Sequence, residues 1–484
     1  MKSSLTKELE MFTASLEAAA KELPKDGWRL RYHIMPPVGW LNDPNGLCYF
    51  HGEYHLFFQY SPSDANGSLK YWGHYVSPDL LSWEYKGIAL YPDMPYDCNG
   101  VYSGSALVEE NEVFLYYTGN VKLSGDYDYI YSGREGNTVL AVMDENGAVS
   151  GKRLLMKNSD YPEHVSCHVR DPKVWKENGC YYMVLGARTK QDKGCVLLYE
   201  SSDCLTWTLK NILETEETFG YMWECPDMFC LDGERILSVS PQGLEQKGLN
   251  YANIYQSGYM VVYGDFTGKY RLGCFKEYDR GFDFYAPQTF EAPDGRRILI
   301  GWMGMPDSDY TNATVLRGWQ HCMTIPRELT YKNGQLYQNP VRELEKLRGA
   351  KTQMEISQAE MIKVCGSSDL VLIFDENEPA DFSLCIDDGL CIDYDKENKI
   401  FQMSFLQDSS LGCGRTKRGV ILDGLKNLRL LLDTSSVEIF INSGAEAFSS
   451  RFYPEMDEDS PGKHCLSFRA GKALMTAWRL EEKV

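Results

Sequence analysis

The sequence predicts an all-β protein, with a five-bladed β-propeller, a C-terminal β-sandwich and a short N-terminal helix. Three observations lead to this prediction. One hairpin pattern recurs five times between residues 40 and 304. A polar pattern, Ser-x-Asp-x-x-x-Trp, recurs one hairpin after two of these copies, and a second region of alternating apolar residues follows a short helical segment.

Residues 1–27 are predicted to contain the N-terminal helix. Apolar residues stand three or four positions apart between Leu5 and Leu23, with Lys and Glu between them. This spacing gathers the apolar side chains on one face of a helix. One amphipathic helix therefore leads the chain.

Residues 28–339 are predicted to form the propeller. Each hairpin copy is an apolar strand, an acidic or Gly/Asn turn and a second apolar strand. The turns are 54 to 68 residues apart, enough for a four-stranded blade with its loops, and they fall near Gly52, Asn111, Gly179, Gly233 and Gly295. The hairpins alone would also suit a generic antiparallel sandwich, so the Ser-x-Asp-x-x-x-Trp pattern at residues 77–83 and 201–207 is the further support for blades.

Residues 340–350 are predicted to be a linker and residues 351–484 a β-sandwich. The run PVRELEKLR at 340–348 has helical spacing. Beyond it, apolar alternation resumes at 369–375, 401–406, 428–433 and 436–444. About 130 residues of this kind suit two packed antiparallel sheets.

Charge and composition exclude several classes of function. With 49 basic and 69 acidic residues, the formal net charge is −20, which would repel nucleic acid. No segment has the pattern of a signal peptide or a membrane span. We therefore expect a cytoplasmic protein with a small-molecule partner and no nucleic-acid or membrane partner, and the sequence leaves the oligomeric state open, a homo-oligomer included.

The cysteines favour a reduced protein. They number fifteen, an odd count, and show no C-x-x-C spacing. This pattern indicates neither a zinc site nor a complete disulfide framework, so reduced thiols are expected. Neither a metal nor an organic cofactor is predicted.

One polar residue stands at the entry to each of the five hairpins, eight to twelve positions before the turn: Asp43, Ser103, Asp171, Glu224 and Asp283. Equivalent positions in successive blades converge on the axis of a propeller. Carboxylates and a hydroxyl gathered there would form a concave site at one end of the channel. A pair of carboxylates is what glycoside hydrolysis requires, one as nucleophile or base and the other as proton donor.

The local sequence suggests a role for each carboxylate. Asp43 lies in an Asn-Asp-Pro-Asn-Gly turn whose polar donors would keep it ionised as a nucleophile. Glu224 follows Tyr-Met-Trp, and apolar neighbours would raise its pKa and keep it protonated as the general acid/base. Asp171 follows Arg170, which would hold it charged as an anchor for the transition state.

Each of these residues also has a structural interpretation. Asn-Asp-Pro-Asn-Gly is a good turn, and an Arg-Asp pair is usually a structural ion pair. The tryptophans in the strands are equally consistent with core packing, and the single histidines with structural hydrogen bonds; these are Trp40, Trp72, Trp223, Trp302, His33, His55, His74 and His168.

At these residues the sequence resembles the β-fructofuranosidase family of glycoside hydrolases, the invertase and sucrose-6-phosphate hydrolase type known as glycoside hydrolase family 32. The resemblance runs from about residue 28 to the end of the chain. The motifs that carry it are HIMPPVGWLNDPNG at 33–46, FFQY at 57–60, WGH at 72–74, YSGS at 102–105, YTGN at 117–120, RDP at 170–172, WECPD at 223–227, DFY at 283–285, TIPREL at 324–329 and SVEIFINSG at 436–444.

The resemblance implies a retaining enzyme that hydrolyses the fructosyl linkage of sucrose or sucrose 6-phosphate, with the three carboxylates in the roles given above. The alternatives on the same scaffold are an exo-acting hydrolase of fructans or fructooligosaccharides and a fructosyltransferase. A sugar-binding module without catalysis is a third alternative, although all three carboxylates are present. The substrate-binding residues expected on this basis are Trp40, Asn42, Gln59, Trp72, Tyr102, Ser103, Arg170, Cys225 and Trp302.

The stretch at 121–137 is longer than the resemblance leads us to expect. It carries Lys122 and Arg134, which are our candidates for binding a phosphate on the substrate. The alternative is that both are solvated loop charges. Because imported sucrose is commonly phosphorylated, we expect sucrose 6-phosphate to be accepted at least as well as sucrose.

Overall fold

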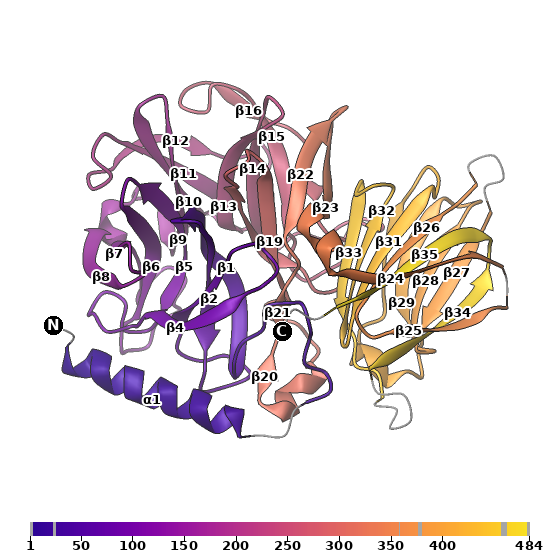
Figure 1. The fold of residues 1–484 in the computed structure, drawn as a ribbon. Helices are drawn as coiled ribbons and strands as arrows, with labels where there is room; N and C mark the ends of the chain where they lie inside the picture. Colours follow the sequence, from indigo (N-terminus) through magenta and orange to yellow (C-terminus); the bar gives the residue numbers. More distant parts are fainter. Residues whose placement is uncertain (1–2, 23–25, 358, 376–379, 456–461, 482–484) are drawn as a thin grey trace.

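The computed structural model describes residues 3–22, 26–357, 359–375, 380–455 and 462–481. These residues form one α-helix, four short 3₁₀ helices and thirty-five strands arranged in seven sheets. Figure 1 shows the sheets in two groups, with the N-terminal group in indigo to salmon and the C-terminal group in orange and yellow. The predicted all-β class is therefore confirmed.

The N-terminal helix α1 (Ser4–Lys21) begins after Ser3, whose hydroxyl accepts a hydrogen bond from the Thr6 N–H at 3.1 Å. It lies along the first sheet (Figure 1), where Tyr85 donates to Glu17 at 2.7 Å and Thr6 donates to Asp93 at 2.6 Å. Among the described residues, no helix is both long and apolar enough to cross a membrane.

The N-terminal group contains five antiparallel sheets, and β20 joins the first of them in parallel with β1. The first sheet contains β1 (Gly39–Phe50), β2 (Glu53–Ser61), β3 (Tyr71–Ser77), β4 (Glu84–Leu90) and β20 (Trp319–Gln320). The second contains β5 (Val101–Glu109), β6 (Glu112–Lys122), β7 (Arg134–Met143) and β8 (Val149–Met156). The third contains β9 (Val165–Glu177), β10 (Cys180–Thr189), β11 (Gly194–Ser201) and β12 (Thr208–Leu213).

The fourth and fifth sheets complete this group. The fourth contains β13 (Met222–Leu231), β14 (Glu234–Gln242), β15 (Gly258–Gly264), β16 (Tyr270–Leu272) and β17 (Lys276–Glu277). The fifth contains β18 (Tyr285–Glu291), β19 (Arg297–Met303), β21 (Cys322–Met323), β22 (Arg327–Lys332) and β23 (Gln335–Pro340). The 3₁₀ helices η1 (Asn158–Asp160) and η2 (Ala313–Arg317) lie in the connections.

All five predicted hairpins are present, as β1–β2, β5–β6, β9–β10, β13–β14 and β18–β19. The repeated Ser-x-Asp-x-x-x-Trp pattern is one recurring turn. Asp79 accepts hydrogen bonds from the N–H groups of residues 81 and 82, and Asp203 accepts the same bonds from residues 205 and 206. Both copies lead into the last strand of their sheet, as the repeat predicted.

Burial separates the inner strands of each sheet from the outer ones. In β2 every residue after Glu53 is buried, whereas in β4 only Leu90 is buried and the other residues are exposed or partly buried. The first strands of consecutive sheets contact one another in the order β1, β5, β9, β13 and β18, and β18 also contacts β1.

Each of these five first strands has a register shift, or β-bulge, near its N-terminal end. The shifts fall between Leu41 and Pro44, Tyr102 and Gly104, Arg170 and Lys173, Glu224 and Asp227, and Tyr285 and Gln288. Within three of them a residue other than glycine has a positive φ: 63° at Asp171, 46° at Cys225 and 47° at Ala286. A bulge breaks the alternation of a strand and redirects its side chains, and such strained positions concentrate at functional sites.

The C-terminal group is a sandwich of two six-stranded antiparallel sheets, which follows η3 (Arg342–Leu347) within the predicted linker. Both sheets contribute to one apolar core that includes Leu370, Leu384, Ile439 and Leu466. One sheet contains β24 (Arg348–Ile356), β26 (Ser368–Ile373), β31 (Asn427–Asp433), β32 (Ser436–Ile441), β33 (Glu446–Arg451) and β35 (Ala473–Leu480). The other contains β25 (Met361–Cys365), β27 (Phe382–Ile386), β28 (Leu390–Asp395), β29 (Ile400–Phe405), β30 (Lys417–Ile421) and β34 (Lys463–Ala470), with η4 (Ser410–Gly412) beside it.

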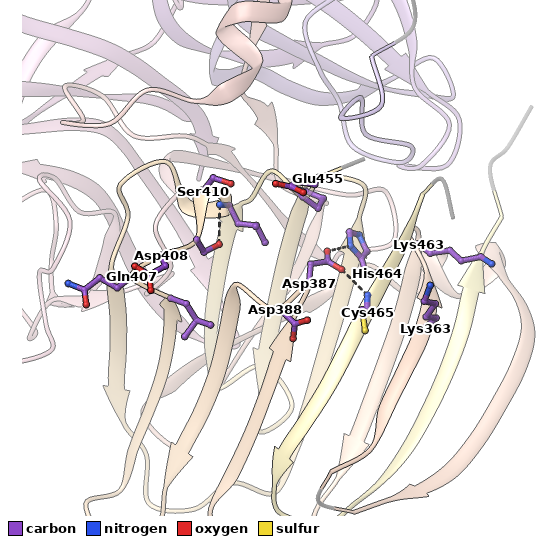
Figure 2. A pocket seen from close by; sticks show the side chains of 14 residues that line it. Lys363, Asp387, Asp388, Gln407, Asp408, Ser410, Glu455, Lys463, His464 and Cys465 are labelled. Carbon is purple, nitrogen blue, oxygen red and sulfur yellow. Dashed lines mark hydrogen bonds and ion pairs between the residues drawn. The ribbon is translucent and has the colours of Figure 1, made fainter. Parts of the chain in front are cut away.

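A hollow of about 660 Å³ lies on the sandwich (Figure 2). Its lining mixes acidic and basic side chains. Asp387 accepts hydrogen bonds from the His464 imidazole at 2.6 Å and from the Cys465 N–H at 2.8 Å. None of the predicted site residues lines this hollow.

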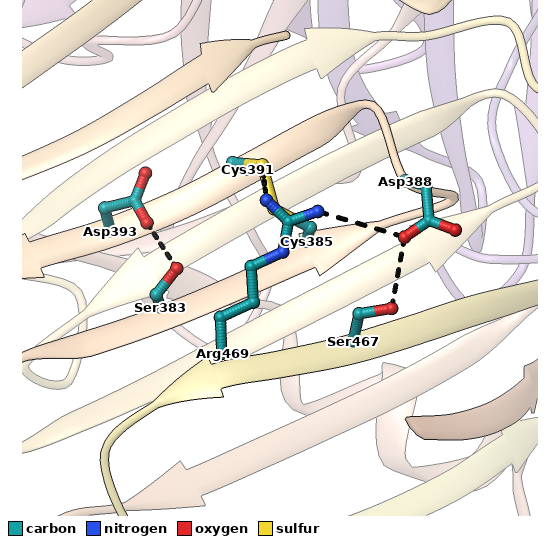
Figure 3. Close-up of a disulfide and its surroundings, with 7 residues drawn as sticks. All are labelled: Ser383, Cys385, Asp388, Cys391, Asp393, Ser467 and Arg469. Carbon is teal, nitrogen blue, oxygen red and sulfur yellow. Dashed lines mark hydrogen bonds and ion pairs between the residues drawn. A yellow bond between two sulfur atoms is a disulfide. The ribbon is translucent and has the colours of Figure 1, made fainter. Parts of the chain in front are cut away.

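The sandwich also contains a disulfide between Cys385 and Cys391 (Figure 3). The two residues are direct cross-strand partners in the β27–β28 hairpin, with Cα atoms 4.1 Å apart. The expectation of reduced thiols is wrong for this pair, because the hairpin register places the two sulfur atoms side by side. The other thirteen cysteines are free.

A network of buried charges joins the two groups of sheets. Arg327 of β22 contacts Glu438 of β32 at 2.5 Å and Asp279 at 3.1 Å. The imidazole of His33 contacts Glu438 at 3.0 Å and Asp433 at 2.8 Å. The side chains of all five residues have no exposed surface. Burial opposes protonation of His33, but its bonds to the two carboxylates outweigh that effect and raise its pKa.

Candidate active site

The five bulges bring together one pair of residues from each first strand. Asp43, Ser103 and Asp171, which the sequence places at equivalent positions, all stand at the bulges. The fourth and fifth assignments need correction, because the residues at the equivalent positions are Cys225 and Ala286. Glu224 precedes its bulge by one residue, and its side chain therefore points to a different part of the site from Asp43 and Asp171.

Asp43 is buried and held by three polar side chains. Its Oδ2 accepts hydrogen bonds from the Ser103 hydroxyl and from Gln59 Nε2 at 3.3 Å, and its Oδ1 accepts one from Asn42 Nδ2 at 3.1 Å. Burial raises the pKa of Asp43, while the bonds from Ser103 and Asn42 lower it. Desolvation dominates, so the prediction that turn donors alone keep Asp43 ionised needs correction.

Cys225 lies between two of the carboxylates. Its thiol is 3.5 Å from Asp43 Oδ2 and 3.6 Å from Asp171 Oδ2, and its backbone N–H donates to Asp171 Oδ2 at 2.9 Å. Burial and these carboxylates raise the pKa of the thiol well above its usual value. Cys225 is therefore a protonated donor that holds Asp43 and Asp171 at a shared point.

The environment of Glu224 is polar rather than apolar. One carboxylate oxygen contacts Arg170 at 2.6 Å and 3.0 Å, and the other accepts hydrogen bonds from Gln242 at 2.8 Å and Tyr285 at 2.6 Å. Trp223, the apolar residue directly before Glu224, is fully buried and does not surround the Glu224 carboxylate. The predicted apolar pocket around Glu224 is therefore wrong.

Asp171 also differs from its prediction. The Arg170 guanidinium is 4.0 Å from Asp171 but 2.6 Å from Glu224, so it pairs with the more distant residue in sequence. Burial raises the pKa of Asp171 to about 7, and Arg170 opposes this rise only in part. Arg170 therefore does not keep the adjacent Asp171 carboxylate ionised.

Replacing Asp171 with Asn is expected to stabilise the fold at alkaline pH. The folded pKa of about 7 exceeds the ordinary 3.8, so the folded state binds the proton more tightly than the unfolded chain. The stability that this proton supplies is present at low pH and is lost as pH rises through 7. We expect Asp171→Asn to raise the free energy of unfolding at pH 8 by up to about 4 kcal/mol, and by less at pH 5.

Thermal unfolding at the two pH values checks this expectation, with Asp203→Asn as the control. The N–H groups of residues 206 and 205 lower the pKa of Asp203 to about 2, so its neutral replacement should destabilise the protein at pH 8. A fall in Tm at pH 8 for Asp171→Asn would contradict the expectation.

Aromatic side chains surround the carboxylates. Trp40 donates to Asn42 at 2.7 Å and lies 5.7 Å from the ring of Trp302, which contacts the ring of Tyr285 at 6.3 Å. Trp40 and Tyr102 are partly exposed, whereas Trp72 has no exposed surface and donates to the Tyr102 carbonyl at 3.1 Å. Trp72 thus supports Tyr102 from the interior, and its contact with substrate stays a prediction.

Asp283 does not join the other carboxylates. It lies before β18 and faces the sandwich, where it accepts hydrogen bonds from Tyr310 at 3.0 Å and from the Arg451 N–H at 2.8 Å, with Arg415 3.5 Å away. The prediction that it rings the site is wrong because the bulge of the fifth sheet falls at Tyr285 and Ala286 instead.

Sequence reasoning gave no role to Tyr285 or Gln242 and only a structural role to His168. A signal for Tyr285 was present: Asn-Asp-Pro, Arg-Asp-Pro, Glu-Cys-Pro and Tyr-Ala-Pro end at prolines 44, 172, 226 and 287. This alignment places Tyr285 in register with Arg170 and Glu224. Gln242 belongs to a neighbouring strand and carries no comparable signal.

The histidines support the structural interpretation given to them above. His33 belongs to the buried charge network, and the rings of His55 and His74 are 3.0 Å apart between their nearest nitrogens. His168 is part of the site, since its Nδ1 accepts from Arg170 Nη1 at 2.6 Å. Its Nε2 therefore carries the hydrogen, which is donated to the Tyr129 carbonyl at 3.0 Å.

Comparison with known proteins links this arrangement to a family. Residues 33–340 match the family model for the glycosyl hydrolases family 32 N-terminal domain, and residues 362–476 match that for the glycosyl hydrolases family 32 C terminal. The sucrose-6-phosphate hydrolase of Bacillus subtilis (strain 168) is 39% identical over 495 residues, which cover 97% of this chain and 98% of that protein.

Two solved structures agree with these matches. The sucrose-6-phosphate hydrolase of Lactobacillus gasseri superposes with a TM-score of 0.86 at 32% identity, covering 97% of this chain and 96% of that one. A family 32 β-fructofuranosidase of Bombyx mori, solved as a mutant in complex with sucrose, has a TM-score of 0.86 at 31% identity, covering 100% and 99%.

Proposed function

The chain belongs to glycosyl hydrolase family 32, and from this premise we propose that it is a retaining β-fructofuranosidase that hydrolyses sucrose and sucrose 6-phosphate. One observation carries the proposal: three carboxylates from three different sheets, Asp43, Asp171 and Glu224, meet at the bulges of the first strands. Burial raises the pKa of both Asp43 and Asp171, and carboxylates whose pKa is shifted in this way are concentrated at catalytic sites.

The five N-terminal sheets are, in this proposal, the blades of a propeller that spans residues 28–339. The cyclic contact of β1, β5, β9, β13 and β18 supports this arrangement. Residues 340–350 link it to the sandwich at 351–484, and residues 1–27 form the N-terminal helical segment. The active site then lies at the axis, where the five bulges converge.

Asp43 is the nucleophile. Three neutral donors on Asn42, Gln59 and Ser103 aim at its carboxylate, and such donors favour the ionised form when substrate binds. Glu224 is the general acid/base, oriented by Arg170, Gln242 and Tyr285. Asp171 is the anchor that accepts hydrogen bonds from sugar hydroxyls in the transition state.

The substrate contacts follow from the same geometry. Side chains that already hold a catalytic carboxylate and also border the site are placed to bind the fructosyl unit: Asn42, Gln59, Ser103, Arg170 and Cys225. Trp40, Tyr102 and Trp302 supply the aromatic walls that sugar faces stack against.

The reaction is a double displacement. Asp43 attacks the anomeric carbon of fructose while the bond to the bridging oxygen breaks, and Glu224 gives its proton to that oxygen. The departing sugar leaves a fructosyl ester on Asp43. Glu224, now a carboxylate, takes a proton from water, which attacks the same carbon and frees fructose and the Asp43 carboxylate.

Sucrose in dilute methanol tests both the activity and its stereochemistry. We expect equal amounts of glucose and fructose in buffer, and methyl β-fructofuranoside as the methanol product, because two displacements restore the configuration. A methyl α-fructofuranoside would rule out retention, and no release of fructose would rule out the function.

Other substrates distinguish the alternatives within the family. Faster release of fructose from inulin or kestose than from sucrose would identify a fructan hydrolase. Accumulation of kestose from sucrose would identify a fructosyltransferase. A phosphorylated sugar is found inside cells, so the proposed substrate supports the predicted cytoplasmic location.

A further inference from the structure

Arg134 lies at the start of β7, directly opposite Lys122 at the end of β6. Its side chain turns toward the active site, where Nε donates to Asn120 Oδ1 at 3.0 Å and Nη2 is 3.4 Å from the Tyr102 hydroxyl. Its guanidinium carbon is 5.7 Å from the centre of the Tyr102 ring. Lys122 is exposed, with its ammonium 5.7 Å from the centre of the Tyr129 ring. The two candidate phosphate ligands thus occupy different environments.

The charge of Arg134 is not balanced by a carboxylate. Within the part of the chain that the structure describes, no ion pair involves Arg134, whereas Arg170 pairs with Glu224 and Arg188 pairs with Asp192 at 2.7 Å. Burial lowers the pKa of Arg134, and the positive charge of Arg170 adds to that effect. Guanidinium groups in partly buried positions are normally matched by an anion, so this one is suited to an anionic ligand.

A second arginine strengthens the positive field. The imidazole of His168 is influenced by Arg170, Arg134 and Arg188 together, and burial with these three charges lowers its pKa to about 2. His168 is therefore neutral and adds no further positive charge. Because Arg170 is paired with Glu224 and Arg188 with Asp192, Arg134 is the arginine of this group whose charge has no carboxylate partner within the described residues.

The contacts of Arg134 with Asn120 and Tyr102 place its guanidinium at the edge of the site, and its charge is attracted by that of Glu224. In the proposed mechanism Glu224 protonates the oxygen of the departing sugar, while fructose lies against Asp43. We therefore expect Arg134 to meet the substituents of the departing sugar.

We propose that Arg134 binds the phosphate group on the departing sugar of the substrate. This inference rests on the proposed function and names the residue that would set the preference for phosphorylated sucrose. The guanidinium Nε donates to Asn120, and one Nη2 hydrogen points to the Tyr102 hydroxyl. Nη1 and the second Nη2 hydrogen remain available to form two parallel hydrogen bonds with phosphate oxygens.

Lys70 is the competing cation at the rim. Its ammonium lies 4.8 Å from the centre of the Trp40 ring, and burial lowers its pKa to about 7 against the opposing attraction of Asp43 and Asp64. It belongs to the side of the nucleophile and already interacts with two carboxylates. A phosphate on the departing sugar therefore favours Arg134.

The test compares kcat/KM for sucrose 6-phosphate and sucrose in the parent enzyme, Arg134→Gln, Arg134→Lys and Lys122→Gln. We expect Arg134→Gln to reduce the ratio of the two kcat/KM values by about 10- to 100-fold, the usual worth of hydrogen bonds to a charged group. Arg134→Lys should recover part of the ratio because it keeps the charge without the paired donors. Lys122→Gln, which removes the same charge from the cross-strand neighbour, should leave the ratio within about 3-fold.

The ratio is the readout because a general disturbance of the site lowers both rates together. An unchanged ratio of the two kcat/KM values in Arg134→Gln would overturn the inference. So would a result in which Lys70→Gln lowers this ratio and Arg134→Gln does not. Inhibition of sucrose hydrolysis gives a measure that needs no variant: glucose 6-phosphate should inhibit the parent at least 10-fold more strongly than glucose. Equal inhibition would also overturn the inference.

Failure of the proposed function has a different signature. A parent enzyme that releases fructose from neither sugar would refute the function and this site with it. A parent that hydrolyses sucrose well, but shows neither the preference nor the inhibition, would refute the phosphate site alone.

Discussion

The substitution Asp43→Asn is expected to reduce kcat for sucrose by about 10⁴-fold or more. Asn has nearly the same shape but cannot form the fructosyl ester, so the double displacement has no first step. Asn42, Gln59 and Ser103 would remain in place, and binding of sucrose should persist. Steady-state release of glucose measures the loss, and calorimetric titration of the variant with sucrose measures the remaining binding.

Asp369→Asn is the matched control for Asp43→Asn. Asp369 is also buried, but it lies in the sandwich, where it pairs with Arg348 and Arg429 at 2.8 Å. Its loss should lower Tm through the unpaired arginines and leave kcat within about 3-fold. A variant Asp43→Asn with more than a hundredth of the parent activity would show that another group is the nucleophile.

The substitution Glu224→Gln is expected to lower kcat for sucrose by about 10²- to 10⁴-fold, the range for loss of a general acid. The effect should depend on the departing group, since an aryl β-fructofuranoside needs no proton to leave. With that substrate the first step should stay fast while the second step, which lacks its base, becomes slow. The fructosyl ester on Asp43 should then accumulate and be visible as an added fructosyl mass on the intact protein.

Azide and a second glutamate variant complete this experiment. Azide is a nucleophile that needs no base, so it should restore turnover of the aryl substrate in Glu224→Gln. Glu177→Gln removes a glutamate that pairs with Arg235 at 2.6 Å, as Glu224 pairs with Arg170, and should change neither substrate's rate by more than about 3-fold. The absence of both adduct and azide rescue would assign the acid/base role elsewhere.

The hairpin repeat predicted the strands well because it depends on local pattern. The turn glycines and the Ser-x-Asp-x-x-x-Trp turns determine where each strand reverses, and all five hairpins form at those positions. The same repeat misplaced Glu224 by one residue and Asp283 by three. A bulge shifts side-chain alternation by one position, and counting back from a turn cannot detect it.

The electrostatic predictions failed for a different reason. They relied on sequence neighbours, whereas Arg170 reaches Glu224, 54 positions away, instead of Asp171 beside it. Strands from several sheets bury Asp43 and Asp171, and this burial raises the pKa of both carboxyl groups. These effects depend on the three-dimensional arrangement of distant strands, which local composition does not contain.

The buried charges between the two groups of sheets bear on how this protein can evolve. Arg327 comes from the N-terminal group and Glu438 from the C-terminal group, and neither has access to water. A substitution that removed either partner would leave the other charge buried and unpaired, which costs about 3 to 5 kcal/mol. The contact between the two groups of sheets therefore depends on a matched acid and base. Recombination that exchanges one group of sheets alone is expected to give a stable protein only where the incoming group supplies the matching residue.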